Sequence, residues 1–171
     1  FSHSIDEYNQ VIGGKTASLI RTSARLGAMA SDADDTAVDA LSTWAWEVGM
    51  VFQIADDALD LVADEQTIGK PAGSDIREGT FTAPVLLAAD GPDGARVREL
   101  LDHAMPYADE TVNEVIALVR AGGFVDQALK FATERLIVAG DALTQLPRGE
   151  PKLILEKLGR FLVDRVEAAR S

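Results

Sequence analysis

The chain contains no cysteine, which excludes disulfide bridges and thiolate metal sites. Basic residues are scarce: 16 lysines and arginines stand against 28 aspartates and glutamates, a formal net charge of −12. We expect no nucleic-acid partner, because non-specific binding depends on basic side chains that neutralise phosphates. No apolar run approaches the length of a transmembrane segment and no signal peptide is visible. With no cysteine to oxidise, a reducing cytoplasm is the predicted location.

The sequence also lacks a convincing alternating strand pattern, a repeat and a low-complexity tract. Instead, apolar residues recur at helical spacing, and 47% of the 171 residues are hydrophobic, enough for one sizeable core. We therefore predict a single all-helical domain over residues 1–171. Ser4 and Glu7 form a capping-box pattern at its first helix, and Asp34 with Asp35 can open the second. The expected helices cover 5–29, a segment from 34 that is stopped before Gly69, 82–89, 95–104, 107–121, 124–146 and 152–170, with a long ordered loop over 62–80.

Three carboxylates lie on one side of an otherwise apolar segment, FQIADDALD at 52–60. In a helix Asp60 neighbours both Asp56 and Asp57, so the acids would repel one another without a cation. Mg²⁺ prefers carboxylate oxygens and commonly shares its coordination shell with water and substrate phosphates. The pattern indicates a metal-diphosphate site. The alternative is a solvated acidic helix face, with which the apolar residues around the motif are less consistent.

Lys15 and Thr16 follow Gly13 and Gly14 inside the first predicted helix. A glycine in a helix interior costs roughly 1 kcal/mol relative to alanine, so a close approach by backbone or ligand would explain the pair. Lys15 could then offer its charge to a phosphate oxygen. The other interpretation is a helix kink beside an ordinary surface lysine, and the isolated segment does not decide between the two.

Taken together, these segments resemble the trans-isoprenyl diphosphate synthases, also called polyprenyl synthetases. The matching stretches are GKTASLI at 14–20, FQIADDALD at 52–60 and GKPAGSDIREGTFTAPVLLA at 69–88. The acidic segment is similar to the family's second aspartate-rich motif. The resemblance implies an all-α isoprenoid-synthase bundle of the class I terpenoid synthase type. It also implies a Mg²⁺-dependent prenyltransferase that condenses isopentenyl diphosphate with an allylic diphosphate to a longer trans-polyprenyl diphosphate.

The resemblance further implies a role for each matched side chain. Asp56 is expected to bind the metal directly, and Asp57 and Asp60 to bind it directly or through metal-bound water. Asp75 is expected to support the same ion. Two cations are expected to grip the allylic diphosphate: Lys15 and Lys70. Thr16 and Gln53 would line the reacting carbons, and Phe52 would orient isopentenyl diphosphate.

Two departures from the family pattern limit what this chain is expected to do. The family's first aspartate-rich motif lies upstream of the matched region and is absent here, so we expect the C-terminal half of a longer, homodimeric synthase that is inactive alone. Thr80 stands where many members carry a lysine. The alternative function is a noncatalytic regulatory subunit of a hetero-oligomeric synthase; a terpene cyclase is less consistent with residues 69–82. A long apolar product would allow loose membrane association, but product length cannot be read from this sequence.

Overall fold

The computed structural model describes residues 4–63 and 71–169, and all regular structure in this part is helical, which confirms the predicted fold class. The elements run in the order α1 (Ile5–Ile12), the π-helical turn η1 (Gly13–Ala17), α2 (Ser18–Ala30), α3 (Asp35–Val62), α5 (Ser74–Arg77), α6 (Ala83–Asp90), α7 (Gly94–Leu101), α8 (Asp109–Ala121), α9 (Phe124–Leu143) and α10 (Glu150–Ala168).

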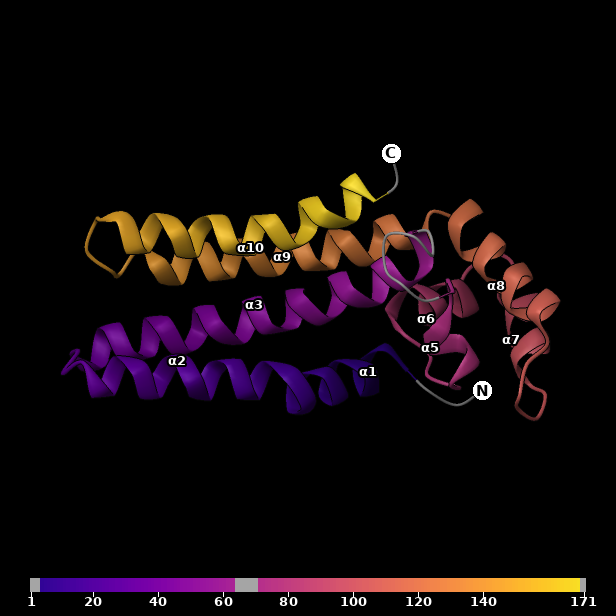
Figure 1. Ribbon diagram of the computed structural model, residues 1–171, viewed down its shortest axis with the longest axis horizontal. Helices are drawn as coiled ribbons and strands as arrows, with labels where there is room; N and C mark the ends of the chain where they lie inside the picture. The colour runs from indigo at the N-terminus through magenta and orange to yellow at the C-terminus, as the bar shows by residue number, and fades with distance from the viewer. Residues whose placement is uncertain (1–3, 64–70, 170–171) are drawn as a thin grey trace.

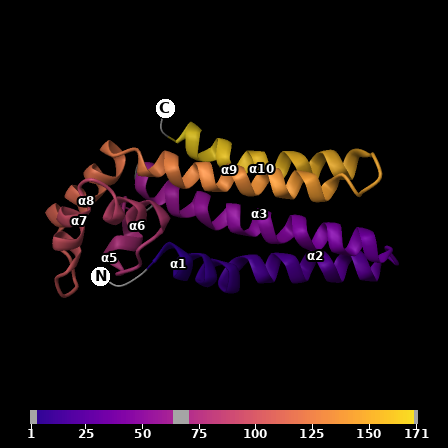
Figure 2. The same cartoon turned by 180° about the vertical axis from the view of Figure 1, so that it is seen from behind.

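Two long helical hairpins lie side by side (Figure 1). The first runs α1, η1 and α2 outward and returns along α3, and the second consists of α9 and α10. The shorter helices α5 to α8 gather at one end of the hairpins, an arrangement also seen from behind in Figure 2. Helix α3 contacts α2, α9 and α10, so it forms the centre of the bundle.

Helix α3 begins at a side-chain cap and packs on several sides. The carboxylate of Asp34 accepts the backbone N–H of Ala37 at 2.8 Å, as the sequence predicts. Its neighbours approach closely at Gly49, where an added Cβ would lie 2.6 Å from the Cα of Ala17. Only glycine allows α3 and η1 to come this near.

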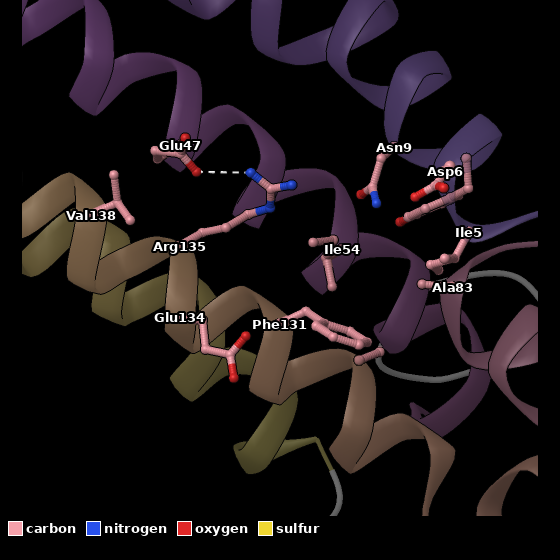
Figure 3. Close-up of a pocket in the computed structure, with 12 residues that line it drawn as sticks. Ile5, Asp6, Asn9, Glu47, Ile54, Ala83, Phe131, Glu134, Arg135 and Val138 are labelled. Atoms are coloured by element: carbon pink, nitrogen blue, oxygen red, sulfur yellow. Dashed lines mark hydrogen bonds and ion pairs between the residues drawn. The ribbon is translucent and has the colours of Figure 1, made fainter.

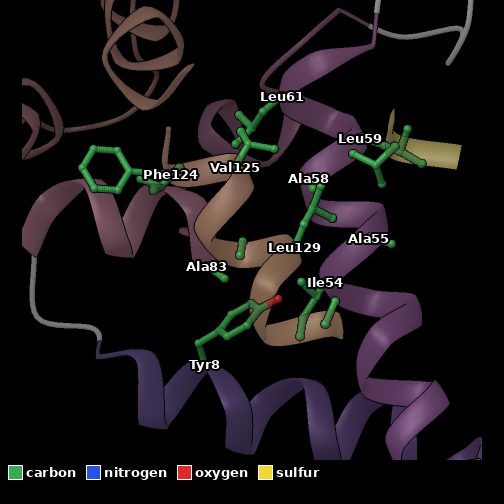
Figure 4. Packing of buried hydrophobic residues seen from close by; sticks show 14 of the residues in the cluster. Tyr8, Ile54, Ala55, Ala58, Leu59, Leu61, Ala83, Phe124, Val125 and Leu129 are labelled. Carbon is green, nitrogen blue, oxygen red and sulfur yellow. The ribbon is translucent and has the colours of Figure 1, made fainter. Parts of the chain in front are cut away.

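The core is continuous from the first hairpin to α9. Figure 4 shows Tyr8 of α1 beside Ile54 of α3, Ala83 of α6 and Leu129 of α9, all of them buried. The hydroxyl end of Tyr8 is the one polar group among these four side chains. Burying it requires a hydrogen-bond partner, because a buried hydroxyl that loses its hydration without a new hydrogen bond costs on the order of several kcal/mol.

The observed elements depart from the predicted ones in two informative places. The single helix predicted over 5–29 is interrupted by the π turn, although the capping box of Ser4 and Glu7 at its start is present. The loop predicted over 62–80 contains the short helix α5, so the prediction was wrong for residues 74–77. Residues 64–70 of that loop lie outside the described residues.

Candidate functional site

A cavity of about 330 Å³ opens between α1, η1, α3 and the segment that leads into α6. Five of the residues that the sequence singles out line it, and they come from three separate segments: Lys15, Gln53, Asp56, Asp57 and Asp75. Thr80, the departure from the family pattern, lines the same cavity. The structure therefore brings the glycine-lysine segment, the acidic motif and the segment after it to one place.

The π turn positions Lys15 at this cavity, and the next residue, Thr16, hydrogen-bonds Gln53 of the cavity wall. One extra residue per turn shifts the register of side chains, and such turns occur frequently at functional sites. A Cβ on Gly13 would lie 3.1 Å from the ring of Trp46 in α3, so this glycine marks a close approach of two helices. A Cβ on Gly14 would have no neighbour within 4 Å. The predicted close approach is thus found at the first glycine, and Lys15 is exposed beside the second.

A chain of three hydrogen bonds runs along the wall of the cavity. The Tyr8 hydroxyl donates to Oδ2 of Asp57 at 2.6 Å, and Nε2 of Gln53 donates to Oδ1 of the same carboxylate at 2.8 Å. The Thr16 hydroxyl donates to Oε1 of Gln53 at 2.8 Å. The chain therefore joins α1, η1 and α3, and it links the two residues that the resemblance places beside the reacting carbons.

Among the residues of this hydrogen-bond chain, Tyr8 is the one that the sequence analysis did not predict. It lies 49 residues from Asp57, so no local pattern connects the two. The available signal was its place on the buried side of an amphipathic helix, where a hydroxyl must find a partner.

Asp57 is buried, with 3% of its surface exposed, and this burial raises its pKa to about 6. The nearby charges of Asp75 and Asp56 also raise the pKa, whereas the hydrogen bonds from Tyr8 and Gln53 lower it. Burial and the Asp57 charge raise the pKa of Tyr8 well above its usual range. The tyrosine is therefore a hydrogen-bond donor at every physiological pH. Strong perturbation in a cleft is typical of functional sites.

Asp60 organises the next segment. Its carboxylate accepts the backbone N–H groups of Ser74 at 3.2 Å and Asp75 at 3.1 Å, and its carbonyl accepts the N–H of Gly73 at 2.8 Å. Gly73 has a φ of 74°, a conformation that favours glycine. Asp60 thereby fixes the start of α5, the helix that brings Asp75 to the cavity.

The remaining predicted residues are placed as follows. Asp56 is exposed on the cavity side, and Phe52 is 41% exposed on the same helix but is not among the residues that line the cavity. Lys70 lies outside the described residues. Within residues 4–63 and 71–169, no three acidic or histidine side chains are grouped closely enough to hold a metal ion by themselves. The ligand role predicted for the four aspartates stays a prediction.

The donors that do meet at the cavity suit a hard divalent cation. Mg²⁺ is commonly held by one or two carboxylates and completes its shell with water and phosphate oxygens. Asp56 and Asp75 supply two carboxylates to one cavity, beside the exposed Lys15. The residues present therefore fit a metal ion that is shared with a phosphorylated ligand.

A second cavity, of about 430 Å³, lies on the other side of Tyr8 between α1, α3 and α9. Figure 3 shows Arg135 of α9 reaching across to Glu47 of α3, a 2.9 Å ion pair, with Asn9 and Asp6 of α1 opposite. The pair is largely shielded from solvent, with side-chain exposures of 27% and 14%. It ties the two hairpins together at the floor of this cavity.

The chain is similar in sequence and in structure to several known proteins. The chain is 38% identical over 164 residues to the nonaprenyl diphosphate synthase of Mycobacterium tuberculosis, covering 95% of this chain and 49% of the relative. It is 32% identical to the heptaprenyl diphosphate synthase component 2 of Bacillus subtilis, covering 92% and 45%. A crystal structure of geranylgeranyl pyrophosphate synthase from Corynebacterium glutamicum, complexed with calcium and isoprenyl diphosphate, superposes with a TM-score of 0.86 at 40% identity, covering 95% and 51%.

The chain thus spans about half the length of these relatives. Among the described helices, none has the combination of length and apolar character needed to cross a bilayer. The polyprenyl synthetase family model matches residues 1–119, which include η1, the acidic motif and the segment through α6. By this match and by its relatives, the chain belongs to the polyprenyl synthetase family.

Proposed function

We propose that the chain forms one wall of a prenyltransferase site that condenses isopentenyl diphosphate with an allylic diphosphate. The observation that carries the proposal is the meeting of Lys15, Gln53, Asp56 and Asp75 at one cavity. Relatives named as nonaprenyl and heptaprenyl diphosphate synthases support the reaction class. The product would be a trans-polyprenyl diphosphate that is one isoprene unit longer than the allylic substrate.

The proposed reaction requires stabilisation of a leaving diphosphate, and the residues of this cavity suit that requirement. The C–O bond of the allylic diphosphate breaks and diphosphate leaves with the electron pair; the isopentenyl double bond then forms the new C–C bond, and loss of a proton restores an alkene. Bond breaking is slow unless the leaving diphosphate is stabilised. A bound Mg²⁺ ion would supply positive charge to that group, held by Asp56 and Asp75.

The other side chains that the resemblance singles out are proposed to have the following roles. The exposed ammonium group of Lys15 can bind a diphosphate oxygen, and Lys70 is proposed to do the same. The oxygens of Thr16 and Gln53, joined by a hydrogen bond, can stabilise the allylic cation by their dipoles. Phe52 is proposed to orient isopentenyl diphosphate. Asp57 and Asp60 are proposed to reach the ion directly or through water, beside the hydrogen bonds they already accept.

Because the chain spans about half of its relatives, we propose that a further segment or subunit completes the cavity with a second acidic motif. The chain alone would then bind Mg²⁺ and diphosphate weakly and would not turn over. A homodimer is the proposed assembly of the complete enzyme. The Bacillus subtilis relative is named component 2 of its synthase, which favours testing a hetero-oligomer beside the homodimer.

One observation favours a second function. Thr80 lines the cavity where the resemblance predicts a lysine, so one phosphate contact is missing or comes from a neighbour such as Arg77. A noncatalytic regulatory subunit would tolerate that loss. The carboxylates of Asp56 and Asp75 and the ammonium group of Lys15 at the same cavity favour the enzyme.

The test is Mg²⁺-dependent incorporation of radiolabelled isopentenyl diphosphate into farnesyl or geranylgeranyl diphosphate by the complete protein. We expect Asp56→Asn to lower turnover by roughly 100-fold or more, since it removes a metal-binding charge. The control is Asp141→Asn, which removes an exposed carboxylate near the end of α9, and its turnover should match wild type. No product from the complete wild-type protein with either primer would refute the enzyme and favour the regulatory subunit.

A further inference from the structure

We infer that Tyr8 is a positioning residue for prenyl transfer: it acts through Asp57 to hold the Gln53 amide, and with it the Thr16 hydroxyl, in one orientation at the cavity. The inference rests on the proposed function. It adds to that function a residue outside the matched motifs and a task for the second aspartate of the acidic motif.

The chemistry of the groups sets the direction of every hydrogen bond in the chain. An ionised carboxylate only accepts, so Asp57 must receive N–H from Gln53, and the Gln53 amide cannot turn over. Its oxygen is then directed at Thr16, whose hydroxyl has to donate. Both oxygens of Asp57 are engaged, one by Gln53 and the other by Tyr8. The orientation of the Thr16 and Gln53 oxygens therefore depends on how firmly Asp57 is held.

Tyr8 supplies that firmness because its ring is locked in the core. The side chain is 8% exposed and lies between Ile54, Ala83 and Leu129 in Figure 4. Its helix begins at the capping box of Ser4 and Glu7, which fixes the backbone one turn before it. A phenol has few rotamers, so its hydroxyl is directed at Oδ2 of Asp57 with little freedom.

Without this hydroxyl the Asp57 carboxylate could rotate about its terminal torsion, which is broad and poorly restrained. Gln53 would lose its single orientation, and the oxygens of Gln53 and Thr16 would no longer be directed at a fixed point. The Tyr8 hydroxyl donates to Oδ2 of Asp57, whereas we assign the diphosphate to Lys15 and the metal to Asp56 and Asp75. Its loss should therefore lower the rate of the chemical step more than it weakens substrate binding.

The experiment compares Tyr8→Phe with Tyr107→Phe in the complete enzyme. The chain has two tyrosines, and the Tyr107 hydroxyl donates to the backbone oxygen of Leu101 at 3.0 Å, away from the cavity. Each substitution removes one tyrosine hydroxyl and keeps the ring. We expect Tyr8→Phe to lower kcat roughly 10- to 100-fold, the usual effect of losing a group that orients a functional side chain, with KM for both substrates close to wild type. Tyr107→Phe should leave both constants unchanged.

A double-mutant cycle shows whether Tyr8 acts through Gln53. In a Gln53→Ala background the amide that Tyr8 orients is absent, so adding Tyr8→Phe should lower kcat no further. If the two effects on kcat multiply instead, Tyr8 acts by another route and the inference is wrong. Tyr107→Phe in the same background is the matched control.

A measurement on the 171-residue chain tests the geometry without turnover. In NMR spectra the side-chain NH₂ group of Gln53 should give a separate pair of signals whose hydrogens exchange slowly with water. Tyr8→Phe should raise this exchange rate toward that of an exposed glutamine, and Tyr107→Phe should leave it unchanged. A Gln53 signal that Tyr8→Phe leaves unchanged would overturn the inference, even if the variant folds less stably.

The outcomes separate this inference from the function on which it rests. A complete wild-type enzyme that transfers no prenyl group refutes the proposed function, and the role of Tyr8 in that reaction with it. An active enzyme in which Tyr8→Phe behaves like Tyr107→Phe refutes the role of Tyr8 alone. A raised KM with kcat intact would also refute it, because it would place Tyr8 in substrate binding.

Discussion

Asp57→Asn is predicted to stabilise the isolated chain at neutral pH, because the wild-type fold buries a charge at this position. Burial raises the pKa of Asp57 to about 6, with Asp75 and Asp56 adding to the rise. The same carboxyl in an unfolded chain has a pKa of about 3.9. Each pKa unit corresponds to about 1.36 kcal/mol, so ionisation lowers the free energy of unfolding by about 3 kcal/mol.

The direction of the pH dependence follows from the raised pKa. Below about pH 4 the carboxyl is protonated in both states, and the fold has its full stability from this group. As the pH rises from about 4 through about 6, the unfolded chain loses its proton first and stability falls. At about pH 7 both states are ionised and the whole cost of about 3 kcal/mol is present.

Asparagine removes this cost and can keep the hydrogen-bond chain. Its Oδ1 can accept the Tyr8 hydroxyl, while its NH₂ group donates to a Gln53 amide that has turned over. Gln53 then donates to the Thr16 oxygen in place of accepting from it. The variant should gain up to about 3 kcal/mol at about pH 7 and little at about pH 4. It should also lose turnover, since the Gln53 oxygen no longer faces Thr16.

The assay is urea unfolding of the 171-residue chain, followed by circular dichroism from about pH 4 to about pH 8 in EDTA. The measured quantity is the difference in unfolding free energy between variant and wild type, so the other carboxylates cancel. Asp141→Asn, at an exposed position of α9, should give a difference that does not change with pH. The reasoning fails if the Asp57→Asn difference is equally flat, or if this variant is the less stable protein at about pH 7.

Two further predictions concern packing and ion pairing away from the cavity. Gly49→Ala should destabilise the chain by roughly 2 kcal/mol, because its Cβ would lie 2.6 Å from the Ala17 Cα, whereas Gly140→Ala, with no neighbour within 4 Å, should stabilise α9 by up to about 1 kcal/mol. Thermal unfolding of both variants checks this, and equal effects would contradict it. Arg135→Ala should cost about 2 kcal/mol by leaving the shielded charge of Glu47 unpaired. Adding Glu47→Gln should recover part of that loss in urea unfolding, and a further loss would contradict the explanation.

The sequence predicts well those features that neighbouring residues determine. The capping box at Ser4 and Glu7 and the cap at Asp34 are both present, since each depends on residues three positions apart. The helices after residue 90 are recovered with ends that differ by a few residues, because helix ends depend on local breakers such as Gly123 and Pro147. The resemblance likewise anticipated which segments meet at the cavity.

The sequence does not predict features that depend on distant packing. The π turn accompanies the fit of Gly13 against Trp46 and of Ala17 against Gly49, across the first hairpin. Helix α5 starts where Asp60 caps it from 14 and 15 residues away. The bond from Tyr8 to Asp57 spans 49 residues. In each case one partner alone is an unremarkable residue, and only the fold brings the two together.

The repulsion expected among the three aspartates of the acidic motif is reduced by the fold before any cation binds. Asp57 turns to the Tyr8 hydroxyl and the Gln53 amide, and Asp60 turns to the backbone N–H groups that begin α5. Asp56 is the member of the motif that stays exposed at the cavity, where Asp75 joins it. Two carboxylates are about what Mg²⁺ takes from a protein when phosphate oxygens complete its shell. The three aspartates of the motif therefore make different contacts, and we expect substitution of each to have a different main effect: on metal affinity for Asp56, on the rate of the chemical step for Asp57, and on the order of α5 for Asp60.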